Sequence, residues 1–145
     1  MDAPIVVLDA CVLYPAALRD LFMRLAVAGL IRARWTDLIH EEWIEAVLRD
    51  RPDLERADLD RTRRLMDEHA EGCLIRNFDH LIPSLLLPDP DDRHVLAAAL
   101  EEGAEWIATW NVTDFPGEVV EPLGITIVTP DELMMRLLGA WPEDT

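Results

Sequence analysis

Acidic residues stand at several points of the sequence where strands are expected to end or helices to begin. Asp9 directly follows an apolar run at residues 5–8, and Asp114 follows a second apolar segment at 105–110. A carboxylate directly after a buried strand has to be hydrogen-bonded, paired or bound to a metal, since an isolated buried charge is very costly. If such acids converge, their repulsion raises their pKa values or draws a cation between them. Oxygen ligands without a His/Cys cluster favour Mg²⁺ or Mn²⁺ over zinc, and such a site suits in-line attack on a phosphodiester.

The segment PDPDDRHVLAAAL, residues 88–100, places three aspartates at the start of an expected buried helix. Helix capping is one explanation. Asp89 is then the N-cap before Pro90 at the first helical position, and Asp91 and Asp92 lie at the positive end of the helix dipole. This explanation requires no function. A functional site is favoured instead if carboxylates from distant parts of the chain reach the same place.

Apolar patterns predict alternating strands and helices along the whole chain. The continuous apolar run at 5–8 is typical of a strand buried on both faces of a parallel sheet. Further strands are expected at 31–35, 73–78, 105–110 and 125–128, and helices at 16–29, 36–50, 56–72, 90–103 and 130–138. This alternation predicts an α/β fold, a three-layer α/β/α sandwich around a mainly parallel sheet of about four or five strands. One domain is expected over residues 1–138, with a loose C-terminal tail at 139–145.

A parallel sheet also predicts where these acids meet. Ligands of open parallel sheets bind outside the carboxyl ends of the strands, near the point where the strand order reverses. Asp9 and Asp114 should therefore lie on one edge of the sheet. The helix that begins at Pro90 is expected to reach that edge only if an irregular connection brings its N-terminus round. The helix at 36–50 carries three further acids, which at such positions ordinarily face solvent: Glu41, Glu42 and Glu45.

Composition limits the class of protein. A chain of 145 residues that is 50% hydrophobic supports one ordinary core. It has no apolar run of membrane-spanning length and no secretory signal pattern. A cytoplasmic protein that does not associate with a membrane is therefore expected. Cys11 and Cys73 are expected to be small core residues. The formal net charge of −16 disfavours a nucleic-acid partner, although most arginines lie in the first half of the chain. Most of these arginines are expected to pair with neighbouring acids on helix faces.

Four motifs, VVLDACVLYP, HEEW, PDPDDRHVLAAAL and TWNVTDF, resemble in order and spacing the acidic motifs of PIN-domain nucleases, whose bacterial members include VapC-type toxins. The similarity spans nearly the whole chain. It implies an Mg²⁺- or Mn²⁺-dependent ribonuclease with four catalytic and metal-binding acids: Asp9, Glu42, Asp92 and Asp114. Asp91 is the alternative to Asp92, and Thr109 and Asn111 resemble supporting polar residues. The resemblance also implies that the fourth helix presents its N-terminal aspartate to the site.

Residues around these motifs have less specific interpretations. Arg93 is a candidate substrate-binding residue, whereas His94 is expected to be a helix-surface residue. Trp35 and Trp43 are expected to pack in the core or at a partner interface. The toxins often carry arginine where Trp110 stands, so a phosphate contact at that position is not expected here.

Other enzyme classes place an aspartate after the first strand, but they need a lysine. Haloacid-dehalogenase phosphatases and response-regulator receivers are both disfavoured, because the chain contains no lysine. The alternative outside enzymology is a PIN-like module that binds RNA or a partner without cutting. If the protein is a toxin, a small antitoxin is expected to insert an Arg or Lys side chain into the acidic pocket and to cover apolar surface with a helix. Homodimerisation is implied by the resemblance. The choice among RNA classes and DNA depends on surface shape and is not predicted.

Overall fold

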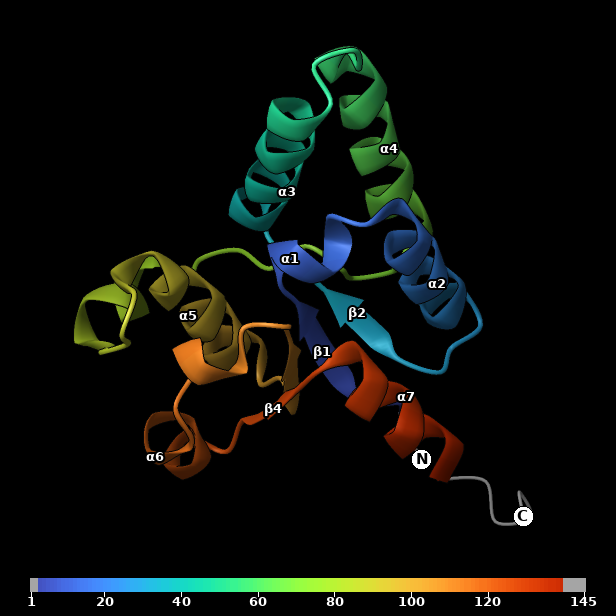
Figure 1. Ribbon diagram of the computed structural model, residues 1–145. Coiled ribbons are helices and arrows are strands. Elements are labelled where there is room, and N and C mark those ends of the chain that lie inside the picture. Colours follow the sequence, from blue (N-terminus) through green and yellow to red (C-terminus); the bar gives the residue numbers. More distant parts are fainter. Residues whose placement is uncertain (1–2, 140–145) are drawn as a thin grey trace.

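The computed structural model describes residues 3–139 and is built around a four-stranded, fully parallel sheet (Figure 1). The strand order is β2-β1-β3-β4. Their bounds are β1 Ile5–Leu8, β2 Arg32–Arg34, β3 Trp106–Ala108 and β4 Thr126–Val128. The chain moves from β1 to β2 on one side and later returns to place β3 on the other side of β1. The strand order therefore reverses at β1, and the crevice beyond the carboxyl ends of β1 and β3 is the expected ligand position.

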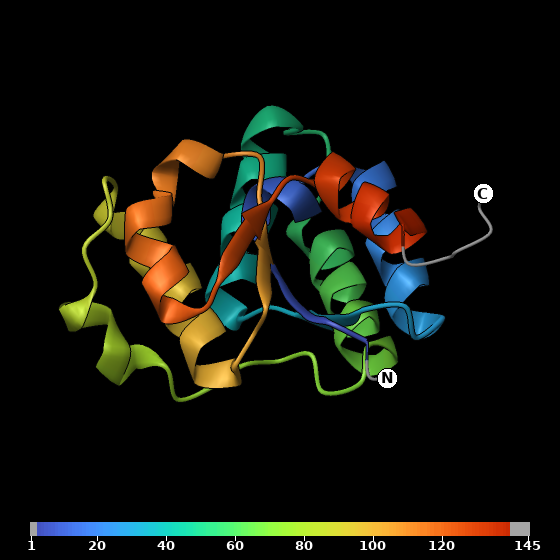
Figure 2. The same ribbon diagram turned by 90° about the horizontal axis from the view of Figure 1, so that it is seen from below.

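Helices cover both faces of this sheet, as predicted for a three-layer α/β/α sandwich. Figure 2 shows α5 and α6 on one side of the sheet and α2, α4 and α7 on the other. The pair α3 and α4 rises beyond the carboxyl ends of the strands in Figure 1. The α-helices are α1 Ala10–Leu13, α2 Ala16–Val27, α3 Asp37–Asp50, α4 Arg56–His69, α5 Arg93–Glu102, α6 Gly117–Val120 and α7 Pro130–Gly139.

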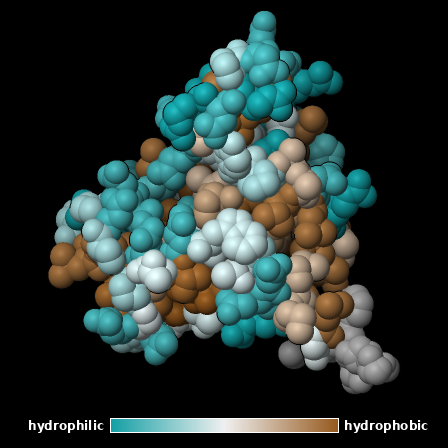
Figure 3. All heavy atoms as spheres, viewed as in Figure 1, coloured by the Kyte–Doolittle hydropathy of each residue, from teal (hydrophilic) through white to brown (hydrophobic). Residues whose placement is uncertain are grey.

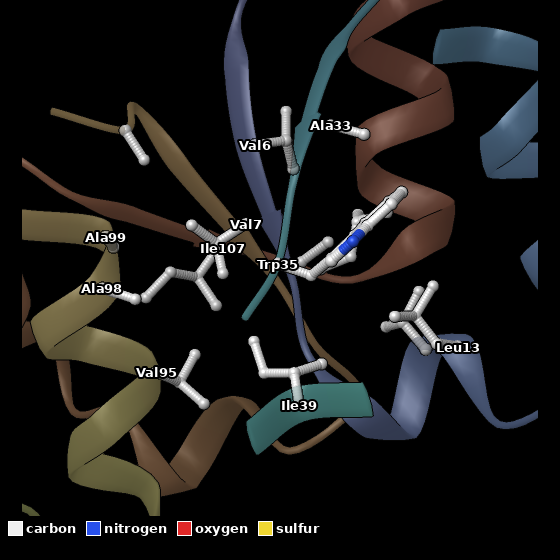
Figure 4. Packing of buried hydrophobic residues seen from close by; sticks show 14 of the residues in the cluster. Val6, Val7, Leu13, Ala33, Trp35, Ile39, Val95, Ala98, Ala99 and Ile107 are labelled. Carbon is white, nitrogen blue, oxygen red and sulfur yellow. The ribbon is translucent and has the colours of Figure 1, made fainter. Parts of the chain in front are cut away.

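One hydrophobic core fixes the helices that carry the candidate site. Ile39 of α3 and Val95 of α5 are both fully buried and point into the apolar interior around the sheet (Figure 4). Ile39 lies three residues before Glu42, and Val95 lies three residues after Asp92. Since a helical residue shares a face with those three or four positions away, burial of these side chains sets the positions of the neighbouring acids.

Several expectations about single elements are wrong in detail. The segment at 73–78 is expected from its sequence to be a strand. It forms only one isolated parallel bridge, between Trp35 and Leu74. The helix expected from Pro90 begins as a 3₁₀ turn over Pro90–Asp92 before α5. A one-turn helix, α1, follows β1 directly, because the Asp9 side chain caps it. α7 includes Gly139, the first residue of the expected tail, and the rest of that tail lies outside the described residues.

The face seen in Figure 3 is mostly hydrophilic, with hydrophobic side chains gathered in several patches. Figure 3 shows polar side chains over the upper part of α3 and α4 and hydrophobic ones gathered over α2 and α7. Val27 of α2 is 64% exposed and Met135 of α7 is 69% exposed. No helix within residues 3–139 is long and apolar enough to cross a membrane.

Candidate active site

Asp9 is the most buried acid of the candidate site, with 5% of its surface exposed. It directly follows β1, whose neighbour β3 is followed by Thr109 in the same register. Thr109 Oγ1 donates to Asp9 Oδ2 at 2.8 Å, and the Ala10 amide donates to Asp9 Oδ1 at 2.8 Å. Burial and the negative charge of Glu42 raise the pKa of Asp9, against the lowering effect of these two hydrogen bonds and His94. The prediction that this carboxylate is hydrogen-bonded is confirmed.

Cys11, expected to be a small core residue, is partly buried and packs against the core, and it also lies beside Asp9 at the site. Its Sγ is 3.3 Å from Thr109 Oγ1 and accepts from the Trp110 amide at 3.4 Å. Burial, together with the charge of Asp9, raises the pKa of the Cys11 thiol. A protonated thiol at this position contacts Thr109 without adding another negative charge beside Asp9. Cys73 is buried, as expected.

Buried polar side chains attach α3, the helix of Glu42, to its neighbours. Trp43 Nε1 donates to His40 Nδ1 at 3.0 Å, which leaves His40 Nε2 as the donor to Asp67 Oδ1 of α4 at 2.9 Å. Trp35 Nε1 donates to the same oxygen at 2.7 Å. The core positions expected for Trp35 and Trp43 are confirmed, since both are fully buried. This network fixes α3 against α4 and the end of β2.

Glu42 reaches the site from the second turn of α3. Its carboxylate Oε2 lies 2.8 Å from Nε2 of His94. The His94 side chain is 11% exposed, so the expectation of a helix-surface residue is wrong. The neighbouring Glu41 instead forms ion pairs with Arg56 and Arg63, away from the site, while Glu45 is exposed. Of Glu41, Glu42 and Glu45, Glu42 is therefore the one that faces the other acids.

The DPDD turn is capped and also presents an acid to the site. Asp89 Oδ1 accepts from the Asp91 amide at 2.9 Å, with Pro90 at the first helical position. The capping explanation is confirmed for Asp89. Asp91 is exposed, whereas Asp92 lines the same cavity as Asp9. Capping thus accounts for Asp89, while Asp92 shares a cavity with an acid from a distant part of the chain.

No irregular connection is needed to bring the start of α5 to this edge. The far end of α5 leads through Gly103, in the left-handed conformation, to Glu105, whose amide donates to the Ile5 carbonyl at the beginning of β1. α5 therefore runs antiparallel to β1 and β3, as a helix before a parallel strand normally does. Its N-terminus returns to the carboxyl ends of the strands. The expectation that an unusual turn is required is wrong.

Asp114 and Asn111 follow β3 and lie near the other acids. Asp114 ends a 3₁₀ helix, Val112–Asp114, and its charge acts on Asp92. The backbone amide of Asn111 donates to Thr109 Oγ1 at 3.0 Å, and Asn111 lines the cavity. Thr109 and Asn111 thus form one polar turn that supports Asp9 and directs the chain toward Asp114.

These side chains surround a cavity of about 400 Å³. Its lining includes Asp9, Cys11, Tyr14, Glu42, Ala46, Arg49, Asp50, Asp92 and Asn111. In the described part of the chain, Arg49 is the one cationic side chain on its wall, and it is not among the residues predicted from the sequence. The i, i+7 relation of Arg49 to Glu42 on one helix face is the signal that could have found it. Arg93 instead donates from Nε to the Pro90 carbonyl of its own turn.

The electrostatics of the cavity favour a cation. Burial, together with the charges of Asp9, Asp114, Asp89 and Glu42, raises the pKa of Asp92 to about 6. Asp92 Oδ2 is buried and has no hydrogen-bond partner among the described residues. Such an orphaned carboxylate oxygen costs free energy unless a cation or proton occupies it. The donor set of carboxylate oxygens fits Mg²⁺ or Mn²⁺.

The side chains are not arranged as a closed metal cage. Within residues 3–139, no group of three or more His, Cys, Asp or Glu side chains stands close enough together to hold a metal ion as they lie. Mg²⁺ does not require such a cage, because it keeps several water ligands and binds proteins through one or two carboxylates. The acids present therefore fit a hydrated divalent cation better than a tightly coordinated structural metal.

Comparison with known proteins agrees with the fold. A family model described as "PIN domain" matches residues 5–113, about three quarters of the chain. The chain belongs to the PIN-domain family. It is also similar to "Putative ribonuclease VapC50" of Mycobacterium tuberculosis, with 43% identity over 54 residues. That match covers 37% of this chain and 32% of the relative, about a third of the relative's length. The family model ends one residue before Asp114. What links Asp114 to the candidate site is its position in the structure, where its charge acts on Asp92.

Proposed function

We propose that this protein is an Mg²⁺- or Mn²⁺-dependent endoribonuclease that hydrolyses RNA phosphodiester bonds. The observation that carries the proposal is that Asp9, Glu42 and Asp92, from three separate segments, line one cavity, and that the charge of Asp114, from a fourth segment, also acts on Asp92. Asp92 is affected by the charges of Asp9, Glu42 and Asp114, although these residues lie up to 83 positions away in the sequence. Membership of the PIN-domain family and the name of the mycobacterial relative support the same activity.

Each residue of the site has a defined part in this proposal. Asp9, Glu42, Asp92 and Asp114 would hold the cation, which when bound supplies water activation and charge stabilisation for in-line phosphodiester attack. Thr109 holds Asp9 in place, and Asn111 extends the polar wall. Arg49 lines the cavity and would bind a substrate phosphate, and Arg93, beside the DPDD turn, remains a second candidate. Asp91 is exposed and does not line the cavity. Its backbone amide donates to the capping side chain of Asp89.

The test compares the wild type with Asp9→Asn on labelled single-stranded RNA, structured RNA and DNA, in Mn²⁺, Mg²⁺ and EDTA. We expect metal-dependent RNA cleavage by the wild type and at least a 100-fold lower rate for the variant, because a catalytic group is lost. Asp91→Asn is the matched control, since it changes an equivalent charge outside the cavity. Cleavage that persists in Asp9→Asn or in EDTA would contradict the proposal.

We infer further that the enzyme is the toxin of a type II toxin–antitoxin pair acting in the cytoplasm, as its VapC-like motifs indicate. A small antitoxin would place an Arg or Lys side chain in the acidic cavity and a helix on apolar surface. Val27, Leu65 and Met135 are exposed hydrophobic side chains that such a helix, or a second copy in a homodimer, could cover. Purification of the native operon product without any partner, together with normal growth on expression, would argue against a toxin.

A PIN-like module that binds RNA or a partner without cutting is the alternative. The strongly acidic composition favours the partner-binding form of this alternative, since a net charge of −16 opposes RNA binding. The buried, unpartnered oxygen of Asp92 opposes it, because a scaffold has no physical need to retain that cost. Mn²⁺ binding without cleavage of any RNA or DNA would favour this alternative.

A further inference from the structure

Glu42 differs from Asp9 in how its carboxylate is held. The Glu42 side chain is 43% exposed, and its one hydrogen-bond partner within residues 3–139 is His94. Asp9, in contrast, is 5% exposed and accepts from Thr109 and from the Ala10 amide. A glutamate has three rotatable side-chain bonds, so a half-exposed one without a partner samples many rotamers. The position of the Glu42 carboxylate therefore depends on His94.

His94 is itself fixed by the fold. It lies on the first turn of α5, immediately before the fully buried Val95 and two residues after Asp92. Only 11% of its side chain is exposed. The packed helix restrains the imidazole, and the imidazole restrains a carboxylate 52 positions earlier in the chain. Contact between the two residues also links α5 to α3, whose Glu42 lines the cavity.

The second nitrogen of His94 supports a functional reason for this placement. Nδ1 is buried and has no hydrogen-bond partner among the described residues. An unsatisfied buried nitrogen costs free energy, and such groups in native proteins call for an explanation. An apolar residue at position 94 would avoid this cost if packing were the only requirement. The cost is understandable if Nε2 must reach Glu42.

We propose that His94 is a positioning residue that holds the Glu42 carboxylate at the cavity, so that Glu42 contributes to binding a divalent cation only while His94 restrains it. This inference rests on the proposed function, because it concerns the same site. His94 does not itself need to touch the cation or the substrate. It acts in the way that outer hydrogen-bond partners orient metal-binding carboxylates in other proteins.

The test is a double-mutant cycle read by Mn²⁺ binding in calorimetry, without substrate. The variants are His94→Ala, Glu42→Gln and the double variant, with His80→Ala as the control for losing an exposed histidine near a glutamate. Loss of an outer partner commonly weakens metal binding by about 10-fold or more. We expect each single variant to weaken binding by about 10-fold, and the double variant to be no weaker than Glu42→Gln alone. His80→Ala should bind as the wild type does.

A conservative variant separates positioning from general damage to the fold. His94→Gln keeps an N–H donor near Nε2, so it should recover part of the Mn²⁺ affinity that His94→Ala loses. Cleavage by His94→Ala should recover at saturating Mn²⁺, because only the occupancy of the site is reduced. If His94→Ala does not fold, the comparison of His94→Gln with Glu42→Gln in the same cycle provides the test.

Four results would overturn this inference or the proposed function on which it rests. Fully additive losses in the double variant would mean that His94 and Glu42 act independently. Unchanged or tighter Mn²⁺ binding by His94→Ala would mean that the histidine is irrelevant or opposes the cation. If the wild type and Asp9→Asn bind Mn²⁺ equally weakly, the proposed function itself fails. Asp9-dependent binding that is insensitive to His94 would overturn only the positioning role.

Discussion

Thr109 Oγ1 and Asp9 Oδ2 are joined by a 2.8 Å hydrogen bond across the carboxyl ends of adjacent strands. Both residues directly follow strands that pair in parallel, Leu8 opposite Ala108. Thr109 is fully buried, so its hydroxyl stabilises the charged form of Asp9 where water does not reach. The same hydroxyl accepts from the backbone amide of Asn111 at 3.0 Å. One small side chain therefore orders two residues of the candidate site.

Thr109→Val should weaken both the fold and the site. The substitution keeps the shape of the side chain but leaves a buried carboxylate and a backbone amide with one partner fewer, at a cost of about 2 kcal/mol. Urea unfolding at pH 7 without metal measures this loss, and calorimetry should show weaker Mn²⁺ binding. Thr109→Ser, which retains the hydroxyl, should stay close to the wild type. Equal stability of the valine variant and the wild type would show that the hydroxyl is not needed.

Asp92→Asn should stabilise the metal-free protein at neutral pH. The folded state raises the pKa of Asp92 from 3.8 to about 6, so it binds the proton more tightly than the unfolded chain does. The stability from this group is complete below pH 3.8 and is lost as the pH rises through about 6. The variant should therefore exceed the wild type by roughly 1 kcal/mol at pH 7.5, allowing for solvent screening of a partly exposed carboxyl.

The same comparison at pH 4 and with Mn²⁺ provides the controls for Asp92. Near pH 4 the wild-type carboxyl is largely protonated, so the difference in unfolding free energy should shrink. Mn²⁺ should raise the melting temperature of the wild type more than that of the variant, because the cation stabilises the charged carboxylate. An asparagine variant that is less stable than the wild type at pH 7.5 would contradict the assigned electrostatic strain.

His40→Ala should destabilise the protein by about 3 kcal/mol. The change removes a fully buried ring and leaves the Trp43 N–H without its acceptor and Asp67 with one donor fewer. Chemical denaturation at pH 7.5 measures the loss. His69→Ala, at an exposed histidine on α4, is the matched control and should change stability by less than about 0.5 kcal/mol. Comparable small effects of both substitutions would show that the buried network is not important.

His40 also makes a contribution to stability that depends on pH. Burial lowers the pKa of His40, outweighing its hydrogen bond to Asp67, so the folded state keeps the ring neutral. Its stabilising contribution is present above the usual pKa of 6.5 and is lost as the pH falls, when the unfolded chain takes up the proton. The difference in unfolding free energy between wild type and His40→Ala should therefore be largest above pH 7. A difference that grows on acidification would contradict the neutral, buried ring.

Arg49→Gln should weaken RNA binding without changing the metal site. Arg49 is exposed on the cavity wall and forms no ion pair within residues 3–139, so its charge is free to meet a phosphate. Binding is measured on Asp9→Asn protein, which should not cut RNA. Loss of one phosphate contact should lower the slope of log affinity against log salt by about 1. Arg64→Gln, at an exposed arginine of α4 away from the cavity, should leave that slope unchanged.

The sequence by itself predicted the strands, the order of the layers and the acids that follow the strands. Continuous apolar runs identify buried parallel strands because both faces must be covered, and Asp9 is recognisable because it directly follows such a run. The same reasoning failed for the segment at 73–78, where pairing reduces to one bridge between Trp35 and Leu74. Short apolar segments do not specify how far two strands pair, because pairing depends on neighbours distant in sequence.

The tertiary structure decided which of several similar acids face the cavity. Asp91 and Asp92 are adjacent, and their different environments follow from a 3₁₀ turn before α5, whose pitch sequence periodicity does not reveal. Glu42 was separable from Glu41 only through family resemblance, whereas the structure separates them by their partners, His94 for one and two arginines for the other.

Two contacts at the site, His94 with Glu42 and Cys11 with Thr109, join residues 52 and 98 positions apart. Sequence patterns record which face of an element is apolar, since burial repeats with the helical or strand period. They do not record which polar side chains meet between elements, because that depends on how the packed core places one helix against another. The sequence therefore determined the fold and the acidic character of the site, and packing determined its geometry.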